Sequence, residues 1–343
     1  MSRPTINDVA RLAGVSKKTV SRVINNSPLL SVTTRAKVQA VIAETGYVPD
    51  PQARALALGR SMQVALVHDG ALPGVIAEIE AGLLQGLAGS GYTLTTIRLS
   101  PSGGVDELAG FLAQHRPSGV VLDPHLARIP DLVAACDAGQ VKAVMLGGEQ
   151  PSPGLIASQD RIAMARLVAW LVRIGHRRIG LIAGPDHSIT ARERELGYLD
   201  AMADHDLDRG PSLIVAGDNG FASGAEGAAL LLEVSPRPTA IIACSDEMAA
   251  GVVQAAARRG LSLPDDLSIA AFDDTPLAAQ VTPSLTAMRV PWAEMAQAAA
   301  GLITERTGHN RHTVFVPNLS VRESVSERGK QAGFAAEASS SGS

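Results

Sequence analysis

The segment from Thr5 to Asn26, TINDVARLAGVSKKTVSRVINN, constrains the fold of this chain more than any other. Apolar residues recur at helical spacing on both sides of an Ala-Gly-Val-Ser turn, which predicts two short helices joined by a tight turn. Thr5 and Asp8 match a capping box at the start of the first helix, and Gly14 permits the backbone angles that end it. Ser16 is a suitable N-cap for the second helix.

The second helix, expected over residues 17–25, has two different faces. The apolar face, which should pack on the first helix, is formed by Val20, Val23 and Ile24. The opposite face is basic and polar, and it carries Lys17, Lys18, Ser21, Arg22 and Asn25. This arrangement is typical of a helix-turn-helix whose second helix enters the major groove of DNA. A helical hairpin with a solvated polar face is the alternative interpretation.

A third helix is expected over residues 32–45, because Ser31 can cap its start and Gly46 can end it. We therefore predict a small all-α helix-turn-helix domain over residues 1–48. Residues 1–60 contain nine Lys and Arg against three Asp and Glu, a net charge of +6, whereas the whole chain carries −4. If the protein meets nucleic acid, this basic head should make the contact. Aromatic residues make up only 3% of the chain, which argues against a single-strand binder built on stacking.

Residues 49–61 follow this domain and could form a helix of about two turns that begins after Asp50. Isolated helices shorter than about 12 residues are marginal in water, so such a segment can order only when it docks on something. Ala53, Arg54 and Leu56 combine small, cationic and apolar side chains, which suits insertion into a minor groove. A plain interdomain linker is the alternative.

From Gln63 onward, apolar strand patterns alternate with helical ones, which predicts βαβ units and parallel sheets. The series begins again near residues 156–160, so we expect two doubly wound parallel-sheet subdomains over residues 62–330. A small ligand should bind between them, where the carboxyl ends of the strands face a cleft. Residues 331–343 are low in complexity, and we expect a disordered tail there.

Patterns for other classes of protein are weak or missing. The chain has no G-x-G-x-x-G after the first strand, no Walker A loop and no G-x-S-x-G, which argues against an α/β enzyme. His309 and His312 have a spacing that metal ligands can show, but no Cys or acidic cluster stands beside them. We therefore expect a solvated loop there, and no metal or other cofactor.

The two cysteines and the lengths of the apolar runs indicate the cellular compartment of the protein. Cys136 and Cys244 each lie in an apolar stretch, which predicts two buried thiols rather than a disulfide. No apolar run approaches the ~20 residues of a membrane span, and the N-terminus lacks the apolar core of a secretory signal. We expect a cytoplasmic protein without a membrane partner.

The chain resembles the lactose/galactose-repressor family of bacterial transcription regulators over residues 4–325. The segments that carry the resemblance are TINDVARLAGVSKKTVSRVINN (5–26), TGYVPDPQARAL (45–56), IGHRRIGLIAGP (174–185), RELGYLDAM (194–202), CSDEMAAG (244–251), IAAFDDTPLA (269–278) and VTPSLTAMR (281–289). The last resembles the family's crossover between the lobes. The resemblance implies a homodimer, a helix-turn-helix head, a hinge helix over residues 49–61 and a core shaped like a periplasmic sugar-binding protein.

The resemblance also assigns roles to individual residues. Those expected to contact DNA are Thr5, Ser16, Lys17, Lys18, Thr19, Ser21, Arg22, Asn25, Ala53, Arg54 and Leu56. Those expected to line the effector site are His68, Asp69, Asp160, Arg194, Phe221, Ser245, Asp246 and Asp273. Two positions depart from the family: Asp50 stands where Asn is common, and Ser245 replaces an Asn before Asp246.

The function predicted from these observations is a dimeric repressor of carbohydrate-utilisation genes. It would bind an inverted-repeat operator in double-stranded DNA and be released by a small saccharide. Alternatives are a regulator that needs a purine or another small metabolite as corepressor, and a sugar-binding protein without a DNA role.

Overall fold

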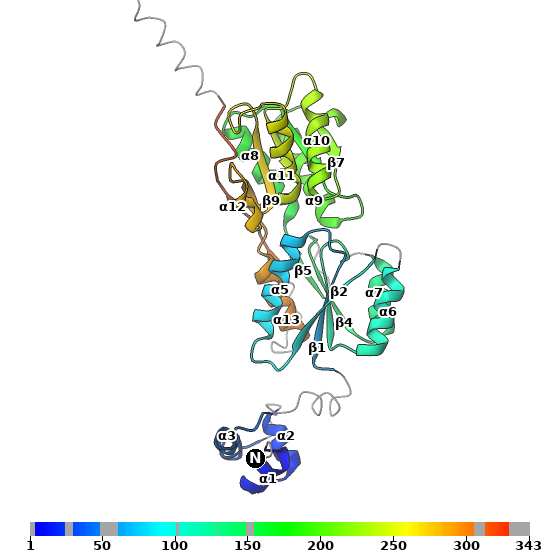
Figure 1. Cartoon of the computed structure of the whole chain (residues 1–343), viewed down its shortest axis with the longest axis vertical. Coiled ribbons are helices and arrows are strands. Elements are labelled where there is room, and N and C mark those ends of the chain that lie inside the picture. Colours follow the sequence, from blue (N-terminus) through cyan, green and yellow to red (C-terminus); the bar gives the residue numbers. More distant parts are fainter. Residues whose placement is uncertain are drawn as a thin grey trace, which may run out of the picture. The chain divides into compact units, whose positions relative to one another are not determined.

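The computed structural model describes residues 4–24, 30–48, 61–100, 103–127, 129–148, 154–304 and 313–328, in two compact units, residues 1–62 and 63–343 (Figure 1). The described part of the first unit forms a head of three helices, as predicted. Its helices are α1 (Ile6–Leu12), α2 (Lys17–Ile24) and α3 (Val32–Thr45). Within the described residues, no helix combines the length and apolar character needed to cross a membrane.

The ends of the head helices are fixed by the residues that the sequence indicated. The Thr5 backbone N–H donates to Asp8 Oδ2 at 3.0 Å, and the Asp8 N–H donates to Thr5 Oγ1 at 3.4 Å, which completes the capping box. Gly14 and Gly46 have φ of +61° and +63°, a region that favours glycine. The small core between the helices is formed by Val9, Ala10, Ala13, Val20, Val23 and Val38.

The second unit contains two lobes, each built on one six-stranded sheet. In the first lobe the strand order is β11-β5-β4-β3-β1-β2, and every pair is parallel. The strands are β1 (Gln63–His68), β2 (Thr93–Arg98), β3 (Gly119–Leu122), β4 (Lys142–Leu146), β5 (Leu155–Ser158) and β11 (Thr313–Phe315). Helices α5 (Pro73–Leu87) and α13 (Trp292–Ile303) cover one face, and α6 (Gly104–His115) and α7 (Pro130–Ala138) cover the other (Figure 1).

The second lobe has the strand order β12-β10-β9-β8-β6-β7, in which only the pair of β12 with β10 is antiparallel. The strands are β6 (Ile179–Ala183), β7 (Ile214–Ala216), β8 (Ala240–Ala243), β9 (Ser268–Asp273), β10 (Thr286–Arg289) and β12 (Asn318–Ser320). The helices are α8 (Asp160–Arg173), α9 (Ile189–Asp204), α10 (Phe221–Glu233), α11 (Asp246–Arg258) and the short α12 (Pro276–Gln280), with a 3-10 turn at Pro211–Leu213.

The chain passes between the lobes three times, at β5–α8, β10–α13 and β11–β12. Residues 281–289 match the family's crossover, but β10 still pairs with β9 up to Arg289, so the chain crosses only after that residue. The sequence patterns also did not indicate α12 and β12. These elements have five and three residues, too few to show a period.

Helices α10 and α11 are in close contact because glycines face the neighbouring backbone. A Cβ atom added to Gly224 would lie 2.2 Å from the Met248 carbonyl oxygen, and one added to Gly251 would lie 2.2 Å from the Phe221 carbonyl oxygen. Side chains at these positions would push the two helices apart, and both helices pack in the lobe core.

Replacing Gly224 by Ala should therefore destabilise the second unit by about 1–3 kcal/mol through overpacking. Gly110→Ala, in the middle of α6, is the matched control, because nothing lies within 4 Å of its added Cβ. There the change should stabilise by roughly 0.5–1 kcal/mol, since Ala is the better helix former. Denaturant unfolding of both variants measures the difference, and equal effects would contradict the close helix contact.

Candidate functional site

Helix α2 presents an exposed basic face on the head. The side chains of Lys17, Lys18 and Arg22 are exposed, whereas Val20 and Val23 on the other side are buried. The structure thus places these three predicted DNA-contacting residues on one accessible surface, and their contacts with DNA stay predictions.

The remaining head residues assigned to DNA are occupied locally or lie outside the described residues. Ser16 caps α2, because its Oγ accepts from the Thr19 N–H at 3.1 Å and lies 2.9 Å from Thr19 Oγ1. Thr5 belongs to the capping box, and Ser21 is half-buried. The positions outside the described residues are Asn25, Asp50, Ala53, Arg54, Leu56, His309 and His312.

A buried ion network lies at the junction of the two lobes. Arg194, on α9, has only 3% of its surface exposed. Its Nε donates to Asp160 Oδ2 at 2.8 Å, its Nη2 donates to Asp273 Oδ1 at 2.8 Å, and its Nη1 donates to the Cys244 carbonyl oxygen at 2.6 Å. The guanidinium also stacks 4.1 Å from the centre of the Phe272 ring. Three of the residues predicted for the effector site are therefore joined in one cluster.

The positive charge of Arg194 is strongly held. Burial lowers the pKa of Arg194, but Asp273 and Asp160 outweigh it and the net shift is upward, so the guanidinium stays charged. Three of its five N–H groups have acceptors among the described residues, and the other two have none there. Burial raises the pKa of Asp273 although Arg194 and a hydrogen bond with Trp292 lower it, and no other partner of its Oδ2 lies among the described residues. Donors and an acceptor side by side suit a ligand rich in hydroxyl groups.

Asp160 and Asp273 also connect the cluster to the crossovers. Asp160 begins α8 at the first crossover, where it accepts from Ser158 Oγ at 2.5 Å, and Asp273 ends β9. The next residue, Asp274, accepts from Ser320 Oγ at 2.7 Å and pairs with Arg322 beyond the third crossover. A ligand that moved Arg194 would therefore act directly on the connections between the lobes.

Ser245 and Asp246 are completely buried and hold the backbone. Ser245 Oγ accepts from the Met248 N–H at 3.1 Å, which caps α11, and donates to the Asn219 carbonyl oxygen at 2.9 Å. Asp246 Oδ2 accepts from the N–H and the hydroxyl of Thr275, at 2.6 and 2.9 Å. Burial, followed by the charge of Asp273, raises the pKa of Asp246 well above its usual value. Its Oδ1 remains without a partner.

A second polar cluster crosses from one lobe to the other. His125 follows β3 in the first lobe and Asn219 follows β7 in the second, and each side chain is 4% exposed. His125 Nδ1 lies 3.1 Å from Asp69 Oδ2, and its Nε2 lies 2.6 Å from Asn219 Nδ2. The ring of His187, after β6, stands edge-on to His125 with centroids 6.2 Å apart.

The pKa values in this cluster are shifted by burial and by the neighbouring charges. Burial lowers the pKa of His125, but the hydrogen bond to Asp69 and the charges of Asp123, Asp69 and Asp273 outweigh it, so the net shift is upward. Asp123 is 4% exposed, and burial followed by the charge of Asp69 raises its pKa to about 7. The surroundings of His125 are therefore rich in carboxyl groups.

The pKa of Asp123 makes stability depend on pH. Its carboxyl takes up a proton more readily in the folded chain than in the unfolded one, where a pKa of about 4 is expected. The contribution to stability is therefore complete below about pH 4 and is lost as pH rises toward about 7. In Asp123→Asn this loss disappears, so the variant should gain roughly 2–3 kcal/mol on wild type between pH 5 and pH 8. Denaturant unfolding of both proteins at several pH values tests this, and a constant difference would contradict it.

Two residues that were predicted to line the effector site lie outside the Arg194 cluster. His68 ends β1 and is half-buried, and its Nδ1 has no hydrogen-bond partner. Burial lowers its pKa. Phe221 begins α10 and is 43% exposed, whereas Asn219, two residues earlier, is buried against the other lobe. The sequence patterns did not single out His125 and Asn219, although both follow a predicted strand, where cleft residues are expected.

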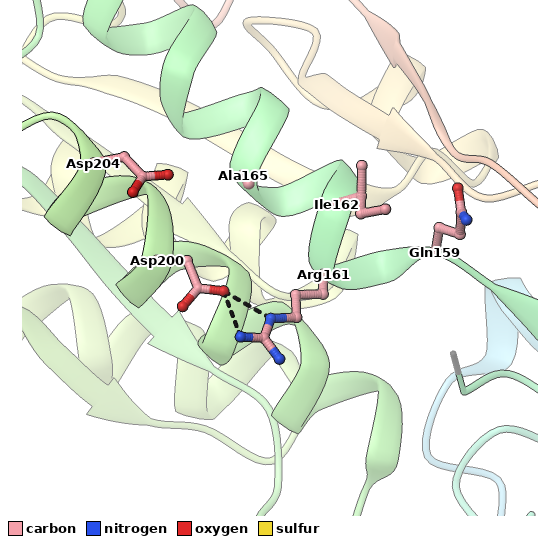
Figure 2. A pocket seen from close by; sticks show the side chains of 6 residues that line it. All are labelled: Gln159, Arg161, Ile162, Ala165, Asp200 and Asp204. Carbon is pink, nitrogen blue, oxygen red and sulfur yellow. Dashed lines mark hydrogen bonds and ion pairs between the residues drawn. The ribbon is translucent and has the colours of Figure 1, made fainter. Parts of the chain in front are cut away.

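A shallow surface hollow of about 440 Å³ lies on the second lobe, between α8 and α9. Its lining residues are Gln159, Arg161, Ile162, Ala165, Asp200 and Asp204. Figure 2 shows Arg161 bound to Asp200 there, and both nitrogen–oxygen distances are 2.7 Å. Both side chains are largely exposed, at 40% and 48%, so this ion pair is a surface counterpart of the buried Arg194 cluster.

The prediction of two buried free thiols can be compared directly with the structure. Cys136 and Cys244 are free and buried, as expected, and burial raises their pKa values to about 11 and about 12. Such thiols are unreactive at neutral pH. Over the described ranges, no group of three or more His, Cys, Asp or Glu side chains is arranged to hold a metal ion.

Comparisons with known proteins give two family matches. Residues 5–50 match the family of bacterial regulatory proteins, lacI family, and residues 168–325 match a periplasmic binding protein-like domain. The ribose operon repressor of Haemophilus influenzae is 31% identical over 339 residues, which cover 94% of this chain and 98% of the relative.

Solved structures show the same similarity over the whole length. The complex of the transcriptional regulator CelR with cellobiose is 31% identical, with a TM-score of 0.71 over 94% of this chain and 100% of that one. The lac repressor dimer bound to operator and the anti-inducer ONPF is 27% identical, with a TM-score of 0.72 over 95% of this chain and 100% of that one. The predicted fold, a helix-turn-helix head and a two-lobed α/β core, is confirmed.

Proposed function

Because the chain belongs to the lacI family of bacterial regulatory proteins, we propose that it is a dimeric repressor whose DNA binding is controlled by a small saccharide. The two heads of the dimer bind the half-sites of an inverted-repeat operator, since a two-fold dimer requires a two-fold site. The genes it controls serve carbohydrate use, and the protein acts in the cytoplasm. We assign it no catalytic role, and its relatives are named as transcription regulators.

The observation that carries the DNA-binding assignment is the exposed basic face of α2. Lys17, Lys18 and Arg22 stand free of the head's own core, while the other side of the helix is buried. Lysine and arginine can bind phosphate oxygens or read guanine in the major groove. The linker residues Ala53, Arg54 and Leu56 are proposed to dock in the minor groove between the two heads.

A saccharide suits the interlobe cluster for chemical reasons. Arg194 has two N–H groups without an acceptor among the described residues, and Asp273 Oδ2 offers an acceptor, which together match the donor and acceptor capacity of hydroxyl groups. The single positive charge of Arg194 is already paired with two carboxyl groups, those of Asp160 and Asp273. An anionic ligand would therefore be repelled, which favours a neutral saccharide over an acidic metabolite.

Control of DNA binding requires that the effector bind the two lobe arrangements with different affinity. The cluster provides this link because Asp160 and Asp273 adjoin the crossovers between the lobes. An effector held by Arg194 shifts the equilibrium between these lobe arrangements. Strand β1 is the first element of the core, so a change in the position of the first lobe is transmitted to the linker through β1.

The experiment that tests this function is the selection of random duplex DNA by the purified protein, followed by sequencing of the recovered sites. A palindrome with a flexible pyrimidine–purine step at its centre is expected, and its release by a pooled saccharide mixture would identify the effector class. Enrichment only when purines are added would favour a corepressor instead. No enrichment under any of these conditions would contradict a specific DNA reader.

Leu56→Ser tests the proposed minor-groove insertion. Loss of an apolar wedge should weaken binding to the selected palindrome by about 10- to 100-fold, corresponding to roughly 1–3 kcal/mol. Binding of an identified saccharide should stay within about twofold of wild type, because the core does not contain this residue. Titration of labelled operator and of saccharide measures both, and a parallel loss of the two activities would contradict the separation of roles.

A further inference from the structure

Residues of the two lobes come into contact at several places. A Cβ atom added to Gly147, after β4, would lie 2.8 Å from Thr190 Cγ2 on α9. One added to Gly74, on α5, would lie 3.0 Å from the Thr275 side chain. These are van der Waals contacts, which many small residues could make. The contact between His125 and Asn219 is different, because it is a hydrogen bond between two buried polar side chains.

We propose that His125 and Asn219 form an interlobe latch, a hydrogen bond that exists only when the lobes are closed and that sets how much effector is needed to close them. This inference rests on the proposed function, because it concerns the regulation of the same cleft. It assigns a positioning role to two residues that the sequence patterns did not single out.

Each half of the latch is oriented by its own lobe. Asp69 holds the His125 ring from the first lobe, with Nδ1 3.1 Å from Oδ2. Ser245 holds the Asn219 backbone from the second lobe, and the left-handed φ of +69° at Asn219 directs the chain at this point. Because both partners are fixed beforehand, closing the latch orders few additional groups.

The neighbours also define the tautomer. Asn219 Nδ2 is a donor, so the nearby His125 Nε2 must accept, and the ring proton then sits on Nδ1 and is donated to Asp69. The chain Asn219–His125–Asp69 thus satisfies every ring nitrogen in the closed arrangement.

Opening the lobes would expose both side chains to water, which can satisfy them. Removing one partner therefore leaves the open arrangement unchanged but leaves the other partner buried and unpaired in the closed one. The closed arrangement alone is weakened. The latch also lies beside the Arg194 cluster, because the Cys244 carbonyl accepts from Arg194 and the next residue, Ser245, donates its hydroxyl to the Asn219 carbonyl. Closure of the latch and enclosure of a ligand at Arg194 are thus the same movement.

Hydrogen–deuterium exchange of the full-length protein, without DNA or effector, tests the latch. Amides of residues 120–127 report the His125 loop, and amides of residues 216–222 report the Asn219 loop. His125→Ala and Asn219→Gly should each accelerate exchange in both loops by roughly tenfold, because loss of a buried partner favours opening. Glycine is chosen at 219 because it tolerates the positive φ.

The double variant and a control make the outcome decisive. In the double variant the two effects should not add, because both single changes remove the same bond. His115→Ala, an exposed histidine on α6, should change neither loop. Amides of β8 should keep wild-type protection in all variants, which shows that the second lobe is folded.

Acceleration confined to the loop that carries the substitution, or additive effects in the double variant, would overturn the latch. Neither result requires an effector, so this experiment tests the latch independently of the proposed function. In a second arm, cellobiose is added as the probe. If the loops are coupled but cellobiose and the pooled saccharides leave their exchange unchanged, the saccharide assignment fails and the latch remains.

Discussion

Replacing Arg194 by Met is expected to lower the free energy of unfolding of the two-lobed unit by about 3–5 kcal/mol. The methionine can fill much of the space of the arginine stem, so the loss is mainly electrostatic. Without the guanidinium, the carboxylates of Asp160 and Asp273 remain buried, at 1% and 0% exposure, with no opposite charge beside them. Denaturant unfolding, followed by a probe of the second unit, measures the loss.

The control is Arg161→Met, the arginine of the surface ion pair with Asp200 (Figure 2). It lies in the same lobe, but water screens the pair, so the loss should stay below about 1 kcal/mol. A third variant replaces Arg194, Asp160 and Asp273 together by Met, Asn and Asn. It should recover much of the stability, because no uncompensated charge stays buried. Equal losses for Arg194→Met and Arg161→Met would show that burial of the cluster has no special role.

The same variant separates the two functions of the chain. The sequence alone suggests that loss of Arg194 abolishes effector binding and leaves the rest intact. The structure changes this expectation, because Arg194 is also a structural link between β9, α9 and the first crossover. We therefore expect loss of the effector response together with loss of core stability, while the head, a separate compact unit, keeps its fold.

The combined variant Lys17→Ala, Lys18→Ala and Arg22→Ala is expected to bind the selected operator about three orders of magnitude or more weakly than wild type. Each cation that binds a base or phosphate contributes roughly 1–3 kcal/mol, and all three are exposed on one face of α2. The slope of log affinity against log salt should also become shallower, by up to about 0.9 for each phosphate that the variant no longer neutralises.

A charge-matched control removes three exposed arginines from the core, at Arg166, Arg173 and Arg177. Its net charge equals that of the head variant, so it should bind operator within a few-fold of wild type if the DNA contacts are local. Circular dichroism should show the head still helical in the triple variant, since Val20 and Val23 keep its core. Comparable weakening in the two variants would indicate a general charge effect instead of a reading surface.

The head shows why some features could be predicted from the sequence. Thr5, Gly14, Ser16 and Ser31 act within a few residues of their own position, so caps and turns follow from local chemistry. The alternation of apolar strands and amphipathic helices is equally local, and it indicates the order of elements in both lobes. The sequence also indicated that Arg194, Asp160 and Asp273 belong to one site, through resemblance to a family.

Other features depend on segments that are far apart in the chain. His125 and Asn219 are 94 positions apart, and nothing near either residue indicates that the other lies 2.6 Å away. That Ser245 and Asp246 line the effector site stays a prediction, and nothing near them in the sequence indicates that their hydrogen bonds hold Asn219 and Thr275 in place. The reason is that a side chain's partner is set by the packing of whole lobes.

Local sequence was enough to predict a helix-turn-helix head with a basic outer face and a doubly wound core. It was enough because caps, periodicity and charge are properties of neighbouring residues. Other features depend on the packing of distant segments. Helix α13 packs in the first lobe, the chain crosses between the lobes three times within the described residues, and Arg194 pairs with both Asp160 and Asp273. These features follow from which surfaces bury one another, and burial gives a charge or a hydrogen bond its strength.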